Sequence, residues 1–212
     1  MKNAKKQGYI KKLDLFKNLS ENEIDKISYL ARDIEYPKKH TFIFQEDDVD
    51  GVYILVEGSV KVFRTNENGK DINLSLKSRG DIIGEMAALE GDVRSASVET
   101  LEKSILLKFS KRDFDNLLKK YPSVAKNLLK ILSKRLREAG SQYEETLSLP
   151  LKERVQKVLI TLSGKVGSKE IVISHQDLAS IVGATRPRVS EELGELEREK
   201  KIALLHKKII LK

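Results

Sequence analysis

Glu85 and Arg94 stand nine positions apart in the stretch GEMAALEGDVRSASV, residues 84–98, in which small and apolar residues predominate. A guanidinium with hydroxyl and backbone N–H donors suits a phosphodiester anion, and a carboxylate suits a neutral sugar hydroxyl. The stretch therefore has the residue types of a socket for a small anion. The same two residues could equally be ordinary solvated charges, or could pair with each other across a loop.

A second group of candidate residues lies near the end of the chain, in SHQDLASIVGATRPRVSEELGELEREK, residues 174–200. Ala179 is small, Gly183 follows four positions later, and Val189 follows six positions after that. A small residue, a glycine and a β-branched residue at these offsets let two helices approach, turn and pack. This pattern is typical of a helix-turn-helix that binds DNA.

The second helix of this motif has a predicted inner face of Val189, Leu193 and Leu196. We expect Thr185 to cap it, and Pro187 is tolerated in its first turn. The opposite face would enter the major groove, where Arg binds guanine and Glu accepts from cytosine. The predicted DNA-contacting residues are Ser174, Gln176, Thr185, Arg186, Pro187, Arg188, Ser190, Glu191 and Lys207. The alternative is an ordinary helical hairpin with a solvated charged face.

Short β-rich runs separated by Gly, Asp and Asn clusters occupy residues 41–107, which predicts an antiparallel barrel or sandwich. Before them, Ser20 and Glu23 form a capping box that begins an amphipathic helix. The apolar stripe of that helix is Ile24, Ile27, Leu30 and Ala31.

A long helical segment follows the β-rich region, with a cap at Ser110 and a new start at Pro122. Its apolar stripe is Val124, Leu128, Leu132, Leu136, Ala139, Tyr143 and Leu147. Because this stripe is longer than one small β domain can cover, it predicts pairing with a second copy in a parallel coiled coil. The alternative is a core helix packed on its own domain. Gly140 costs about 1 kcal/mol relative to Ala, so we expect a bend or a close neighbour there.

The C-terminal residues complete a small domain. Residues 151–164 predict an amphipathic helix, residues 165–173 predict a small hairpin, and residues 201–212 predict two short strands. These two strands would form a wing whose Lys207 and Lys208 touch phosphates.

The composition narrows the function. The 212 residues carry a net charge of +8, of which +5 lies from Pro150 onward, and this favours a polyanionic partner only weakly. The chain has no Cys, which excludes disulfides, thiolate metal sites and iron–sulfur clusters and favours the cytoplasm. It has neither a bilayer-spanning apolar run nor a signal-peptide pattern.

Other kinds of chemistry find little support. His40, His175 and His206 lie in three separate segments, so we expect neither a metal nor a haem site. No Ser-His-Asp or phosphate-loop pattern is present, and an enzyme is not predicted.

The order of a β domain, a long pairing helix and a winged helix-turn-helix resembles the catabolite-activator/fumarate-nitrate regulator (Crp/Fnr) superfamily of transcription regulators over almost the whole chain. GDIIGEMAALEGDVRSASV resembles the phosphate-binding cassette of its cyclic-nucleotide domain. The resemblance implies that Gly84 gives backbone access, Glu85 takes the ribose 2′-hydroxyl, and Arg94 with Ser95 holds the cyclic phosphate. The implied effector-binding residues are Gly84, Glu85, Met86, Ala87, Arg94, Ser95, Ala96, Ala139, Gly140 and Ser141. Many members of the superfamily keep the fold without binding a cyclic nucleotide.

Two positions depart from the family pattern. The cyclic-AMP receptor has consecutive Thr and Ser on the long helix to contact adenine, and Ala139 and Gly140 stand there in this chain, with Ser141 one position away. The implied effector is therefore cyclic AMP, cyclic GMP or another anion. In the recognition helix, Pro187 and Glu191 replace a frequent Glu and a final Arg, so we expect a different operator.

The predicted fold is α+β, with an N-terminal cyclic-nucleotide-binding-type β-barrel (jelly roll), a long dimerisation helix and a C-terminal winged helix-turn-helix. The predicted ranges are 1–110, 111–149 and 150–212. The predicted function is a cytoplasmic, homodimeric transcription regulator that binds near-palindromic double-stranded DNA, meets RNA polymerase and contacts no membrane. Its effector would be a cyclic nucleotide, without metal, haem or iron–sulfur cluster, and Arg94→Ala should abolish the response and leave folding intact.

Two alternatives stay open. The first is a regulator of the same fold that acts without an effector. The second is a cyclic-nucleotide-controlled module whose C-terminal domain binds protein.

Overall fold

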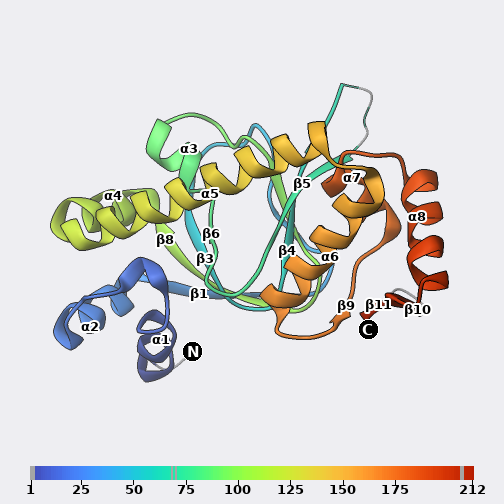
Figure 1. The fold of residues 1–212 in the computed structure, drawn as a ribbon. Helices are drawn as coiled ribbons and strands as arrows, with labels where there is room; N and C mark the ends of the chain where they lie inside the picture. Colours follow the sequence, from blue (N-terminus) through green and yellow to red (C-terminus); the bar gives the residue numbers. More distant parts are fainter. Residues whose placement is uncertain (1–2, 68, 70, 206–207) are drawn as a thin grey trace. The chain divides into compact units, whose positions relative to one another are not determined.

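The computed structural model describes residues 3–67, 69, 71–205 and 208–212. The chain divides into two compact units (Figure 1). Unit 1 comprises Met1–Asp71 and Ser75–Leu136, and unit 2 comprises Ile72–Leu74 and Arg137–Lys212.

Two antiparallel sheets form the body of the first unit. Among the described residues, one sheet has the strand order β1-β8-β3-β6 and the other has the order β2-β7-β4-β5. The strands are β1 (Arg32–Tyr36), β2 (Thr41–Ile43), β3 (Gly51–Glu57), β4 (Val60–Thr65), β5 (Asp71–Lys77), β6 (Ile82–Ile83), β7 (Ser97–Thr100) and β8 (Ser104–Ser110). Successive strands mostly alternate between the two sheets, and this confirms the predicted jelly-roll type.

The central strand β3 explains why the sequence GVYILV is apolar without alternation. All six of these residues are buried, and β3 pairs with β8 on one side and β6 on the other. A strand covered on both faces needs apolar side chains at every position.

Two of the helices of unit 1, α2 (Glu21–Leu30) and α4 (Lys111–Lys120), begin at the caps that the sequence predicts. The others are α1 (Asn3–Ile10), the 3-10 helix η1 (Asp14–Phe16), α3 (Glu85–Glu90) and α5 (Pro122–Ser148), which continues into unit 2. Ser20 and Glu23 make both hydrogen bonds of the capping box, and the Ser110 side chain accepts from the Asp113 N–H. These two predictions are confirmed.

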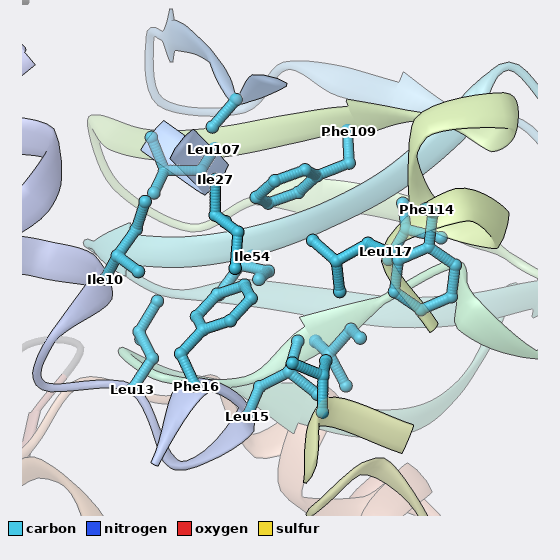
Figure 2. Packing of buried hydrophobic residues seen from close by; sticks show 14 of the residues in the cluster. Ile10, Leu13, Leu15, Phe16, Ile27, Ile54, Leu107, Phe109, Phe114 and Leu117 are labelled. Atoms are coloured by element: carbon cyan, nitrogen blue, oxygen red, sulfur yellow. The ribbon is translucent and has the colours of Figure 1, made fainter. Parts of the chain in front are cut away.

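The largest core cluster of unit 1 lies between one sheet and its helices. Figure 2 shows side chains from α1, η1, α2 and α4 gathered around Ile54 and Leu107 of the sheet. The rings of Phe16 and Phe109 lie 5.9 Å apart between centroids. This packing fixes β3 and β8. Tyr53 of β3 and Lys108 of β8 contact Asp50 in the site described below.

The long helix α5 has two apolar faces. Val124 and Leu128 are buried in the core of unit 1. Leu129, Leu136 and Tyr143 recur every seven residues and are 68–76% exposed, with Leu147 exposed one turn further on. The predicted single stripe is therefore divided: its first residues pack intramolecularly, as the core-helix alternative expected, and its later residues remain uncovered in the chain.

Unit 2 contains the C-terminal motif. Its elements are α6 (Leu151–Val166), β9 (Glu170–Ile171), α7 (His175–Val182), α8 (Arg186–Arg198), β10 (Ile202–Leu205) and β11 (Lys208–Leu211). The described strands form a sheet of order β10-β11-β9. The two predicted C-terminal strands are confirmed, while Lys207 and His206 lie outside the described residues.

Three sequence-based expectations differ from the structure. Helix α6 continues through Gly164 and ends before Gly167, which has a positive φ of 67°. The expected hairpin at 165–173 is wrong, because Glu170–Ile171 pairs with β11 instead. A side chain at Gly140 would meet nothing within 4 Å, and α5 is helical through it, so the expected close neighbour is not found in the described part of the chain.

Candidate functional site

The segment expected to bind an effector, residues 84–98, is called the cassette below. It begins at Gly84, which caps α3 in the left-handed region with φ of 77°. A Cβ at this position would lie 2.4 Å from Nη1 of Arg94. Glycine is thus required twice, for the backbone conformation and for the close approach of the guanidinium.

Arg94 is only 3% exposed, and its side chain makes three hydrogen bonds to described residues. Its Nη1 donates to the Gly84 carbonyl at 2.9 Å, and its Nη2 donates to Oδ1 of Asp50 and to the Gly51 carbonyl, each at 2.7 Å. A buried guanidinium needs such acceptors, because leaving it unpaired would be costly.

Asp50 gathers several donors on the far side of this arginine. Lys108 forms an ion pair with it, and the Tyr53 hydroxyl donates to it at 2.8 Å. Burial alone would raise the pKa of Asp50, but the hydrogen bonds from Lys108, Tyr53 and Arg94 outweigh burial and hold that pKa below its usual value. Burial and the Asp50 carboxylate together raise the pKa of Tyr53.

Glu85 is 5% exposed and is paired with Arg135 of α5 rather than with Arg94. Nη1 of Arg135 lies 2.6 Å from Oε1 of Glu85. Nη2 donates to the Ile82 carbonyl at 2.8 Å and lies 3.4 Å from Oδ1 of Asp81. The alternative that Glu85 and Arg94 pair with each other across the loop is therefore wrong. Each instead has a partner far away in sequence.

The other predicted cassette residues divide by exposure. Ser95 and Met86 are exposed, whereas Ala87 and Ala96 are buried. Ala88, next to Ala87 on α3, is also buried and belongs to the core cluster of unit 1. Ser95 thus presents the exposed hydroxyl that an anion site requires.

The predicted contacts on the long helix lie outside this unit. Ala139, Gly140 and Ser141 are exposed positions of α5 that belong to unit 2. Arg135, in the part of α5 that belongs to unit 1, does contact the cassette, through Glu85.

A cavity of about 380 Å³ adjoins Arg94. Its lining residues are Phe42, Ile43, Phe44, Asp47, Asp48, Asp50 and Arg94. Three carboxylates give this cavity a negative lining, which disfavours an anion.

The helix-turn-helix geometry follows the predicted offsets. Ser174 caps α7 by accepting from the Asp177 N–H at 3.0 Å, Gly183 ends α7 with φ of 66°, and Ala179 and Val189 are fully buried. Thr185 occupies the capping position of α8 but makes no side-chain capping hydrogen bond. The predicted position is right and the predicted bond is not found.

The recognition helix α8 presents the expected charges. Arg186, Pro187, Arg188 and Glu191 are exposed, as are Ser174 and Gln176, while Val189, Leu193 and Leu196 are buried. Ser190 differs from the expectation of a free reading residue, because its hydroxyl lies 2.8 Å from Nδ1 of His175.

Sequence reasoning missed three partners. Arg135, Asp50 and His175 all contact predicted site residues. Arg135 carried a signal, since it lies one helical turn before Ala139 on the same helix. Asp50 and His175 carried none that spacing reveals.

Searches for other chemistry gave two findings. The described residues contain no cluster of three or more His, Cys, Asp or Glu that could hold a metal ion. None of the helices described is both long enough and apolar enough to cross a membrane.

Both the cassette and the helix-turn-helix lie in segments that match known protein families. Residues 34–121 match the family described as cyclic nucleotide-binding domain, and residues 153–212 match the Crp-like helix-turn-helix domain. The cyclic AMP receptor protein of Thermus thermophilus is 33% identical over 186 residues, which cover 87% of this chain and 86% of that protein.

Two solved structures are also similar. The catabolite activator protein of Thermus thermophilus has 30% identity and a TM-score of 0.57, over 94% of this chain and 93% of that chain. The c-di-GMP responsive global regulator CLP of Xanthomonas campestris has a TM-score of 0.79 at 20% identity, over 91% and 99%, and shares the fold. With both domain matches and these relatives in the same order along the sequence, the chain belongs to the Crp/Fnr family of DNA-binding transcription regulators.

Proposed function

We propose that this regulator acts as a homodimer whose affinity for DNA is set by a cyclic nucleotide, or a similar small anion, bound at the cassette. The observation that carries the proposal is the cassette itself: Gly84 has a positive φ and lies against the buried guanidinium of Arg94, and the neighbouring Ser95 is exposed. The relative from Thermus thermophilus is named a cyclic AMP receptor protein, which supports the same class of effector.

The residues present fit such an effector. Among the described residues, the three side-chain hydrogen bonds of Arg94 leave its Nε–H and one Nη1–H unused. Ser95 is exposed, and Glu85 is a carboxylate suited to a sugar hydroxyl. We assign the anion to the cassette rather than to the cavity of about 380 Å³, because Asp47 and Asp48 would repel it there.

Arg135 gives the cassette a link to the long helix. It bonds Glu85 and the Ile82 carbonyl from α5. An effector hydroxyl that bonds Glu85 competes with Arg135 for the same carboxylate. Effector binding therefore weakens the Glu85–Arg135 contact between the cassette and α5. The effector acts through its unequal affinity for two states of the regulator.

The exposed face of α5 supports the homodimer. Leu129, Leu136 and Tyr143 repeat at seven residues, the period of a two-stranded coiled coil, and Leu147 extends the face. A parallel pair would bury these side chains against their own copies and give the assembly two-fold symmetry.

The DNA site follows from that symmetry. Two recognition helices would read half-sites about 34 Å apart in a near-palindromic operator. Arg186, Arg188 and Glu191 are the proposed base readers, and the exposed residues Ser174, Gln176, Thr185 and Pro187 are proposed as further DNA contacts. Lys207, outside the described residues, is proposed for the wing. RNA polymerase is the proposed protein partner, and the cytoplasm is the proposed location.

One observation favours a second candidate, a regulator of the same fold that needs no effector. Both groups expected to bind the ligand already have protein partners, Arg94 with Asp50 and Glu85 with Arg135. The cassette would then be a structural element.

Titration calorimetry with cyclic AMP and cyclic GMP separates the two candidates. The effector proposal predicts heat with one or both, and a marked loss of affinity in Ser95→Ala, whose exposed hydroxyl can be removed without disturbing the core. The matched control is Ser59→Ala, whose hydroxyl donates to Glu102 outside the cassette. No heat and no thermal shift at millimolar nucleotide would favour the effector-independent regulator.

A further inference from the structure

The contact between His175 and Ser190 joins the two helices of the DNA-binding motif. His175 is the first residue of α7, and Ser190 lies in the second turn of α8. Nδ1 of the imidazole lies 2.8 Å from the Ser190 hydroxyl oxygen, and both side chains are half-buried. Both residues belong to unit 2, and α7 and α8 pack directly on each other.

The position of Ser190 on the recognition helix explains this contact. The buried face of α8 is Val189, Leu193 and Leu196. Ser190 is adjacent to that face, on the flank it shares with Arg186 one turn earlier, whereas Glu191 lies almost opposite the buried face. A side chain on the flank can meet α7 or a base edge, and the structure has it meeting α7.

The chemistry of the pair limits what Ser190 can do at DNA. Either the Ser190 hydroxyl donates to Nδ1 or an Nδ1–H donates to the Ser190 oxygen, according to the tautomer of the ring, and in both cases the contact holds that oxygen on the α7 side of α8. To turn its oxygen toward a base edge, Ser190 would have to move away from the imidazole, and a half-buried ring nitrogen would lose this partner. The contact therefore opposes base reading by Ser190.

We propose that His175 is a positioning residue for the recognition helix: its imidazole engages Ser190, so that Ser190 fixes α8 on α7 instead of reading a base. This rests on the proposed sequence-specific DNA binding and assigns His175 a role in it. Discrimination among operators then depends on His175, although its side chain need not touch a base.

The experiment compares single and double variants on a defined duplex. A random-sequence pool is enriched with the wild-type protein, and binding to the enriched duplex is measured against a non-enriched duplex of equal length. The variants are His175→Ala, Ser190→Ala, the double variant and His175→Asn, whose amide can bond the hydroxyl in place of Nδ1. Ser180→Ala is the matched control, because the only bond of the Ser180 hydroxyl to the described residues is to the Gln176 carbonyl in its own helix.

The expected result is a shared loss. His175→Ala and Ser190→Ala each lower the ratio of specific to nonspecific affinity by about threefold to tenfold, as expected for one hydrogen bond. The double variant loses no more than either single one, His175→Asn recovers most of the ratio, and Ser180→Ala leaves it unchanged. Preference falls at several base pairs together, which a serine that reads one base would not produce.

Two results would overturn the inference. One is a Ser190→Ala variant that loses preference at a single base pair while His175→Ala keeps the full profile. The other is a double variant whose loss is the product of the single losses, since independent roles multiply. If wild-type protein enriches no duplex at all, the proposed sequence-specific binding fails, and this inference fails with it. Melting temperatures of all variants show whether a loss of preference comes from unfolding. If His175→Ala is unfolded, recovery of the specific to nonspecific affinity ratio in His175→Asn is the result that tests the inference.

Discussion

The charged residues of the cassette and those of the recognition helix are arranged in opposite ways. Arg94 and Glu85 are at most 5% exposed, and each is paired with a partner from a distant segment. Arg186 and Arg188 are exposed, and neither has an ion-pair partner among the described residues. The first pair is therefore part of the stability of unit 1, whereas the second pair is free to meet an outside ligand.

This difference gives one kind of substitution two distinct consequences. Removing a buried, paired arginine costs stability because it leaves a cavity and an uncompensated charge. Removing an exposed, unpaired arginine costs little stability and affects only what it binds. Four predictions test this difference between the cassette and the recognition helix.

The largest effect is expected at Arg94. Because it is buried and bonds Asp50, Arg94→Ala should lower the free energy of unfolding by about 3–5 kcal/mol. The sequence alone suggested that this variant would fold normally, and the burial of Arg94 replaces that expectation. Urea denaturation followed by circular dichroism measures the change. An unaltered unfolding midpoint would show that buried Arg94 contributes no more to stability than the exposed arginines of α8.

The exposed face of α5 should give the next largest effect. Leu136→Glu removes an apolar contact worth about 1.5–3 kcal/mol when fully buried, once in each protomer of a symmetric pair. Sedimentation velocity should show a shift from dimer to monomer. Tyr29→Glu is the control, because Tyr29 is equally exposed on α2 of the same chain. A dimer that persists in Leu136→Glu would mean that another surface pairs.

Smaller effects are expected at each arginine that we propose to read bases. Arg186→Ala and Arg188→Ala should each weaken binding to the enriched duplex by about 1–3 kcal/mol and leave the melting temperature unchanged. Arg198→Ala serves as the control, since Arg198 is exposed at the far end of the same helix. Fluorescence anisotropy measures the affinity. Equal weakening by Arg198→Ala would point to general charge attraction rather than base reading.

The acid sensitivity of Asp50 should give the smallest effect. Its folded pKa is depressed, so the unfolded chain binds more protons and the stability from Asp50 is lost as the pH falls from about 4 through the folded value. Asp50→Asn should therefore flatten the loss of unfolding free energy in this range. A wild-type slope in Asp50→Asn would show that the carboxylate's partners do not stabilise the fold.

The sequence predicts best those features whose signal is local. The capping box of Ser20 and Glu23 spans three residues, and the Ala179, Gly183 and Val189 offsets span ten, so both could be predicted from spacing alone. The uninterrupted apolar run of β3 likewise predicts a strand that is buried on both faces, as the structure shows.

Features that depend on distant residues were not predictable in this way. Asp50 lies 44 positions from Arg94, and Arg135 lies 50 positions from Glu85, so only the folded chain shows that they pair. Strand β1, Arg32–Tyr36, directly follows α2 and pairs with β8 late in the domain. The hairpin expected at 165–173 failed for the same reason, because its strand prefers the remote β11.

The most direct test of the account is the affinity for the enriched duplex with and without cyclic AMP or cyclic GMP. Coupling between the cassette and the recognition helices predicts a change of about 5–150-fold with the nucleotide that binds, and no change in Ser95→Ala. Identical affinity in the presence and absence of a nucleotide that calorimetry shows to be bound would contradict it.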